Sequence, residues 1–283
     1  MAKPNVLLLT LEYPRWADAG KYGYESNFGL EEGFAANGVS FTTMPMMFGD
    51  QQSPWSKWFN SIHRQLRGKR FDQVWFDVVH SNYPDGFLDF IQSLAPARIG
   101  YFGESSEFHP LELARNPEGV ALRRQKVARA LPYATHLIAV DEADVARFNA
   151  DGKTPAFWWA SGFIPRRFIA ADPAPANANP ALFHGTLYGN RQEWLARPEL
   201  AGLLAQGTSL EDKSPWPAQY DELNRDIAEA LTNGAELEDP MFSRFIGAIR
   251  LARQSCYPLW LQSLRRGCAV VNLPQFAQAY ASR

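Results

Sequence analysis

The chain has 283 residues, of which 46% are hydrophobic and 20% are charged, and its formal net charge is −2. This composition supports a sizeable core and excludes disorder as the main state. The near-neutral charge excludes the large basic field on which nucleic-acid binding depends.

Two further features bear on the compartment. No stretch reaches the roughly 18 apolar residues of a membrane span, and the N-terminus lacks the apolar core of a signal peptide. The two cysteines, Cys256 and Cys268, are expected to be free thiols. We therefore expect a cytoplasmic protein, and the sequence leaves peripheral association with the inner membrane face open.

Apolar runs alternate with helix-periodic segments through the first 160 residues. Strands are predicted at residues 5–10, 39–44, 73–79, 98–102, 136–140 and 156–159. Helices are predicted at residues 26–37, 54–66, 85–94 and 117–131, and another follows Asp141, which is suited to cap it. Strands that alternate with helices predict a mostly parallel sheet covered on both faces.

Residues 172–180 read DPAPANANP, a composition typical of a linker. They divide the chain into an N-terminal domain, 1–171, and a shorter C-terminal domain, 181–283. Residues 181–185 form an apolar run that enters a glycine loop, as residues 5–10 do in the first domain. A strand, a glycine loop and a helix commonly open a nucleotide-binding unit. The predicted fold class is therefore α/β, with two Rossmann-like domains facing a cleft and the second one shortened.

The second unit has a less regular pattern. A helix interrupted by Pro198 is predicted at residues 190–206, followed by a proline-containing loop at 207–219 and a helix at 220–232. Residues 258–266 are expected to be helical and 269–272 to form a strand. Periodicity leaves both a strand and a helix open for residues 244–252.

The first glycine loop contains Gly20, Lys21 and Gly23. Glycines at this place allow backbone N–H groups to approach an anion, and the following helix adds partial positive charge at its N-terminus. The loop is not a Gly-x-Gly-x-x-Gly motif, and a plain turn is the alternative interpretation. We expect these three residues to approach a bound anion.

Several segments taken in order resemble a known family. They are residues 19–23, 100–110 (GYFGESSEFHP), 136–148, 161–168 (SGFIPRRF), 182–191 (LFHGTLYGNR) and 257–271. This order resembles the GT-B glycosyltransferases of the retaining, nucleotide-sugar-dependent kind, and residues 182–191 are most similar to the spore-maturation type. The resemblance covers most of the chain apart from about residues 195–250.

The resemblance implies roles for particular residues. His109 would lie near the transferred sugar. Glu104 and Glu107 flank the same loop, and either one would orient an acceptor hydroxyl or accept its proton. A lone histidine is otherwise a structural residue. Donor binding would involve the second glycine loop, through Gly185, Thr186 and Arg191.

The chain also departs from the family pattern. Gln254 and Gln262 stand at the spacing where the family often has two glutamates. A glutamine oxygen accepts hydrogen bonds without a charge, and hydrogen bonds to charged groups are worth about 1.5–3 kcal/mol against ~1 for neutral ones. We expect both glutamines to lie in the donor site and to bind the donor more weakly.

The expected activity is transfer of a sugar from a nucleotide-diphosphate donor to a glycan, lipid-linked or protein acceptor. No Asp-x-Asp motif occurs, and the resemblance implies charge neutralisation without a metal or other cofactor. Two alternatives stay open: a non-catalytic GT-B scaffold that binds a partner, and a nucleotide-sugar epimerase. Self-association of the shortened chain also stays open.

Overall fold

The computed structural model describes the parts of the chain on which the following account rests. These are residues 3–12, 27–47, 54–79, 81, 83–84, 86–103, 106, 113–114, 116–159, 181–183, 191–206, 222–223, 225–226, 229–230, 233, 239–244, 246–247 and 270–271.

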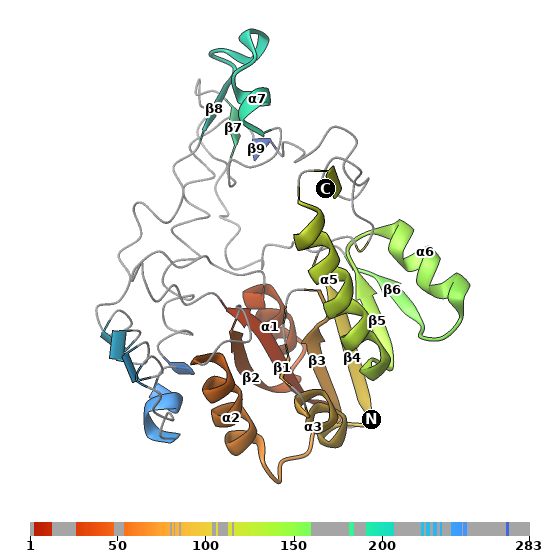
Figure 1. Ribbon diagram of the computed structural model, residues 1–283, viewed down its shortest axis with the longest axis vertical. Coiled ribbons are helices and arrows are strands. Elements are labelled where there is room, and N and C mark those ends of the chain that lie inside the picture. Colours follow the sequence, from red (N-terminus) through yellow and green to blue (C-terminus); the bar gives the residue numbers. More distant parts are fainter. Residues whose placement is uncertain are drawn as a thin grey trace.

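Six strands form one parallel sheet in the order β2-β1-β3-β4-β5-β6 (Figure 1). They are β1 (Asn5–Glu12), β2 (Ser40–Met47), β3 (Gln73–Asp77), β4 (Ala97–Phe102), β5 (His136–Ala139) and β6 (Ala156–Trp158). The six strands predicted for the first 160 residues are confirmed. Pro45 lies within β2, which tolerates it because β2 is at the edge of the sheet.

Helices connect consecutive strands, as the alternating pattern predicted. They are α1 (Asn27–Ala36), α2 (Pro54–Leu66), α3 (Phe87–Leu94), α5 (Pro117–Ala130) with the short 3-10 helix η1 (Leu131–Tyr133), and α6 (Glu142–Asp151). Local sequence sets their ends. Asp141 caps α6 by accepting a hydrogen bond from the Ala143 N–H at 2.9 Å, as expected, and Gly152 ends that helix with φ of 67°.

Both faces of the large sheet are covered by helices, as the sequence pattern predicted. On β3, Val74 and Phe76 belong to the core shared with α2 and α3. Trp75 points to the opposite face, because successive strand residues alternate, and packs edge-on against Phe34 of α1 with 5.3 Å between ring centroids. The sheet is therefore the middle layer of an α/β fold of the Rossmann-like kind.

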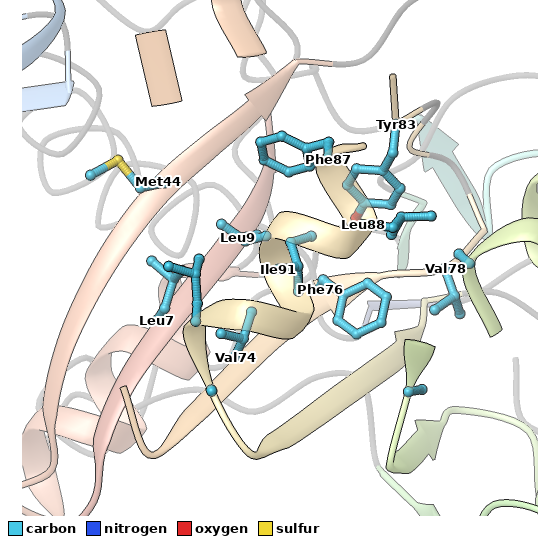
Figure 2. Packing of buried hydrophobic residues seen from close by; sticks show 14 of the residues in the cluster. Leu7, Leu9, Met44, Val74, Phe76, Val78, Tyr83, Phe87, Leu88 and Ile91 are labelled. Carbon is cyan, nitrogen blue, oxygen red and sulfur yellow. The ribbon is translucent and has the colours of Figure 1, made fainter. Parts of the chain in front are cut away.

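Aromatic rings fill the core under α3. Tyr83 is buried and stacks on Phe87 at 5.9 Å between centroids, while Phe76 meets Tyr83 edge-on at 6.3 Å (Figure 2). Leu7 and Leu9 of β1 lie on the same face and are fully buried. This core holds the segment that follows β3, since Tyr83 lies six residues after Asp77, the last residue of that strand.

A second parallel sheet has the order β8-β7-β9. Its strands are β7 (Ala181–Phe183), β8 (Leu204–Gln206) and β9 (Val270–Val271). Strands were predicted at the positions of β7 and β9, and both are confirmed. The helix predicted over 190–206 is wrong in its second half. The α-helix α7 covers only Arg191–Leu195. It is followed by the 3-10 helix η3 (Pro198–Leu200), and Gly202, with φ of 75°, then turns the chain into β8.

Residues beyond the predicted linker also contribute to the core of the large sheet. Leu223 and Phe242 are buried in the same cluster as Leu7, Phe59 and Phe76. The helical segment 239–244 lies beside α2 (Figure 1), where the Arg64 guanidinium donates to a carboxylate oxygen of Asp239 at 2.9 Å. That hydrogen bond is the main cause of the lowered pKa of Asp239.

This packing bears on the division into domains. The predicted linker, 172–180, lies outside the described residues, so the boundary stays a prediction. The helical residues described within 220–232 fit the helix predicted there, and those within 244–252 favour the helical alternative. Among the described helices, none is long and apolar enough to cross a membrane.

Replacing Phe242 by Ala tests whether this segment is part of the core of the large sheet. Its ring is fully buried, so Phe242→Ala is expected to lower the free energy of unfolding by about 3–5 kcal/mol through loss of burial and creation of a cavity. Denaturant unfolding followed by fluorescence measures the change. The control is Phe157→Ala, because the Phe157 ring is 55% exposed. Equal losses in the two variants would contradict the assignment.

Candidate functional site

The carboxyl ends of the parallel strands form the edge at which a site is expected. β2 lies on one side of β1 and β3 on the other, so the connections that leave β1 and β3 diverge there. In open α/β sheets, ligands bind outside the carboxyl ends of the strands at this switch point. Here those ends are Glu12 of β1 and Asp77 of β3.

A buried tyrosine supports this edge from below. The Tyr101 hydroxyl of β4 reaches across β3 and donates to the Leu9 carbonyl of β1 at 2.9 Å. Both residues are buried, and a hydrogen bond in such surroundings holds its partners firmly in position. The switch point therefore lies on a rigid part of the sheet.

Polar groups gather where β3 ends. The Asp77 carboxylate is buried and accepts a hydrogen bond from the Ser81 N–H at 2.7 Å, while the Asp77 carbonyl accepts one from the Tyr83 hydroxyl, also at 2.7 Å. Together these bonds close a tight turn after the strand. The turn keeps a carboxylate and a serine hydroxyl at the switch point.

Two electrostatic consequences follow from this turn. Burial raises the pKa of the Tyr83 phenol well above its ordinary value of about 10, and the nearby charge of Asp77 adds to the rise. The Ser81 hydroxyl is buried as well, and within the described part of the chain no group forms a hydrogen bond with it. A buried hydroxyl in that state costs about 1–3 kcal/mol.

A second polar cluster lies between the carboxyl ends of β4 and β5. The Asp144 carboxylate, on the first turn of α6, is fully buried and accepts hydrogen bonds from the N–H and the hydroxyl of Ser106 at 2.8 and 2.5 Å. Arg147 donates to the same carboxylate at 3.1 Å and also to the Ser106 hydroxyl. The segment after β4 is thereby tied to α6.

An exposed aromatic ring lies at the carboxyl end of the edge strand. Trp158 of β6 is 53% exposed, and its indole N–H donates to the Val140 carbonyl at 3.3 Å. An indole held in one orientation with a free face suits stacking on a sugar ring. The polar groups along the carboxyl edge thus have an aromatic neighbour on the outermost strand.

The second sheet places one basic residue at its own carboxyl edge. Arg191 is the first residue of α7 and follows the loop that leaves β7. Its guanidinium carbon lies 5.6 Å from the centroid of the Phe183 ring, within the range of a cation–π interaction. Phe183 is buried and ends β7. The ring therefore anchors the arginine at the end of the central strand.

Among the site residues predicted from the sequence, Arg191 is the one within the described ranges. The others lie outside them: Gly20, Lys21, Gly23, Glu104, Glu107, His109, Gly185, Thr186, Gln254 and Gln262. Across the residues that the structure places, no three His, Cys, Asp or Glu side chains come together as a metal site would require. That the activity needs no metal stays a prediction.

Sequence reasoning missed Asp77 and Asp144, two of the three aspartates that are buried among the described residues. Asp144 carries a recognisable signal, because it precedes Phe148 by four residues and both therefore lie on the buried face of α6. A carboxylate on such a face must be paired. Asp77 carries a weaker signal, since it ends an apolar strand but its partner, Ser81, contributes a backbone N–H that no side-chain pattern reveals.

Comparison with known proteins gives no family assignment. No protein-family model matches the sequence, and no curated protein matches it. The class that fold and site define is an α/β protein with a Rossmann-like parallel sheet, whose carboxyl edge carries paired, buried carboxylates. The resemblance to glycosyltransferases stays a hypothesis.

Replacing Tyr83 by Phe tests the turn after β3. The variant loses the 2.7 Å hydrogen bond to the Asp77 carbonyl and is expected to be about 1 kcal/mol less stable at neutral pH. The wild type keeps its phenolic proton when folded and releases it near pH 10 when unfolded. Its stability from this group is therefore complete below pH 10 and falls above it, by up to about 1.4 kcal/mol per pH unit.

The measurement is urea unfolding between pH 8 and pH 11. Above pH 10, Tyr83→Phe should lose stability less steeply than the wild type. The control is Tyr133→Phe, whose hydroxyl donates to Asp89 at the surface and should matter less at neutral pH. If wild type and Tyr83→Phe show parallel pH profiles, the phenol is not buried as described.

Proposed function

We propose that the protein is a glycosyltransferase that moves a sugar from a nucleotide-diphosphate donor to a glycan, lipid-linked or protein acceptor. In this proposal, the two parallel sheets belong to two Rossmann-like units of a GT-B arrangement. The large sheet contributes the acceptor side through its carboxyl edge, and the small sheet contributes the donor side. Both sheets being parallel supports the proposal, because each then has a carboxyl edge suited to ligand binding.

The observation that carries the proposal is the position of Arg191. A guanidinium at the carboxyl end of a central parallel strand, anchored on the Phe183 ring, suits recognition of a diphosphate, because its planar N–H fork matches phosphate oxygens. In sugar transfer the nucleoside diphosphate is the leaving group, and negative charge grows on it in the transition state. A cation placed there would stabilise that charge, which is usually the largest catalytic contribution.

The carboxyl edge of the large sheet offers groups for the acceptor. Carboxylates accept hydrogen bonds from sugar hydroxyls, and hydroxyl groups both accept and donate them. The exposed Trp158 indole supplies a stacking surface of the kind that a glycan requires. His109, Glu104 and Glu107, which follow β4, are the proposed catalytic residues of the acceptor side, and Gln254 and Gln262 are proposed to contact the donor.

Thermal unfolding with nucleoside diphosphates tests donor binding. A ligand present at about 100 times its Kd stabilises the folded state by ~2.7 kcal/mol. UDP, GDP, ADP and dTDP are screened first, and the base that binds then identifies the nucleotide sugars to be assayed. Release of free sugar from one of these donors would support a transferase. Interconversion of sugar epimers without an acceptor would identify an epimerase, and no shift with any nucleotide would favour a non-catalytic scaffold.

Arg191→Ala is expected to weaken binding of the nucleoside diphosphate by about 10- to 100-fold, because hydrogen bonds to charged groups are worth about 1.5–3 kcal/mol. Arg191→Lys should fall between, since it keeps the charge but loses the planar fork. Isothermal titration calorimetry measures both.

The control for this prediction is Arg197→Ala. Arg197 lies just beyond the same helix, and its guanidinium carbon lies 3.7 Å from the centroid of the Trp194 ring. Arg197→Ala therefore removes a nearby positive charge that does not contact Phe183. Wild-type affinity in Arg191→Ala, or an equal loss in both alanine variants, would refute a specific role of Arg191.

A further inference from the structure

Ser106 and Asp144 come from the carboxyl ends of neighbouring strands. Ser106 follows β4 by four residues, and Asp144 lies in the first turn of the helix that follows β5. Phe102 of β4 pairs in register with Ala139 of β5. The two residues therefore meet directly above the sheet, on the edge where the site was placed.

The Asp144 carboxylate uses both of its oxygens on Ser106. One oxygen accepts the Ser106 N–H at 2.8 Å, and the other accepts the Ser106 hydroxyl at 2.5 Å and the Arg147 guanidinium at 3.1 Å. Arg147 also donates to the Ser106 hydroxyl. A main-chain bond and a side-chain bond to one carboxylate fix both the position and the orientation of residue 106.

Helix capping does not account for this carboxylate. Asp141 already caps α6 through the Ala143 N–H at 2.9 Å, which is the usual role of an aspartate at a helix start. A fully buried carboxylate is costly unless several donors compensate it. Here two of the compensating donors are the N–H and the hydroxyl of Ser106. The buried charge of Asp144 therefore holds a residue that follows a different strand, β4.

We infer that Asp144 is a positioning residue for catalysis, which acts through Ser106 on the segment after β4. The inference rests on the proposed function, in which Glu104 and Glu107 act on the acceptor. Covalent geometry keeps the Cα atoms of these residues within about 8 and 4 Å of the Ser106 Cα. We therefore expect the anchor on Ser106 to restrict the positions of both glutamates, and a misplacement of about 1 Å can cost up to roughly 100-fold in rate.

The test compares three variants with a matched control. Asp144→Asn keeps the shape but puts an NH2 group where an oxygen accepts from Ser106. Ser106→Ala removes the hydroxyl, and Ser106→Thr restores one. The control is Asn149→Ala, on the same helix. The Asn149 side-chain amide forms two hydrogen bonds of 2.9 Å with the backbone of Ala156, at the amino end of β6 and away from Ser106. Asn149→Ala should reduce stability without disturbing residue 106.

The first readout is hydrolysis of the donor identified by the nucleotide screen. Asp144→Asn and Ser106→Ala should lower kcat by at least about tenfold while the Kd for the nucleoside diphosphate stays within about twofold. Ser106→Thr should recover most of the lost kcat, and Asn149→Ala should keep a wild-type kcat below its own melting temperature. If kcat in Asp144→Asn equals that of Asn149→Ala, the positioning role is overturned although the proposed function stands.

The second readout needs no activity. Amide hydrogen exchange of peptides covering residues 103–112 should be at least about tenfold faster in Asp144→Asn than in Asn149→Ala, because an opened anchor frees the segment. Equal exchange would overturn the inference by itself. If the wild type binds no nucleotide and releases no sugar, the proposed function fails and the catalytic role fails with it. The exchange data then still decide whether the anchor exists.

Discussion

Parallel pairing of β1 with both β2 and β3 is the constraint on which the rest of the molecule depends. Parallel neighbours need crossover connections. The connection after β1 runs to β2, and the connection after β3 runs the opposite way to β4. The loops must therefore separate at the carboxyl edge. Polar groups are found at that edge, among them Asp77 and Asp144, each buried and each bonded to the N–H of a serine that follows a strand. The core beneath stays apolar because the carboxylates lie above it.

Asp77 and Asp144 share one arrangement. In each case a strand or the helix after it contributes an aspartate, and a nearby serine N–H donates to it at 2.7 or 2.8 Å. The difference lies in reach. Asp77 bonds a residue of its own turn, whereas Asp144 bonds a residue that follows a different strand. The first arrangement shapes a turn, and the second couples two loops of the edge.

Most of the large sheet could be predicted from the residues, because apolar runs and helix caps are local signals. Asp141 and Gly152, for example, mark the ends of α6 by themselves. The helix predicted through residue 206 failed, since β8 gains its stability from pairing with β7, a long-range interaction that periodicity does not report. For the site, Arg191 was singled out by the resemblance of residues 182–191 to a glycosyltransferase pattern, which says nothing of its contact with Phe183. The Asp144 cluster was missed because its partner is 38 residues away.

Leu223 and Phe242 fill the core of the large sheet from a place late in the chain. During synthesis, domains usually fold as units from the N-terminus onward. Here the six strands are complete at residue 158, yet the hydrophobic interior is not closed until residue 242 has left the ribosome. A nascent chain paused between these points exposes apolar surface, and it is in that interval that molecular chaperones would have most to bind.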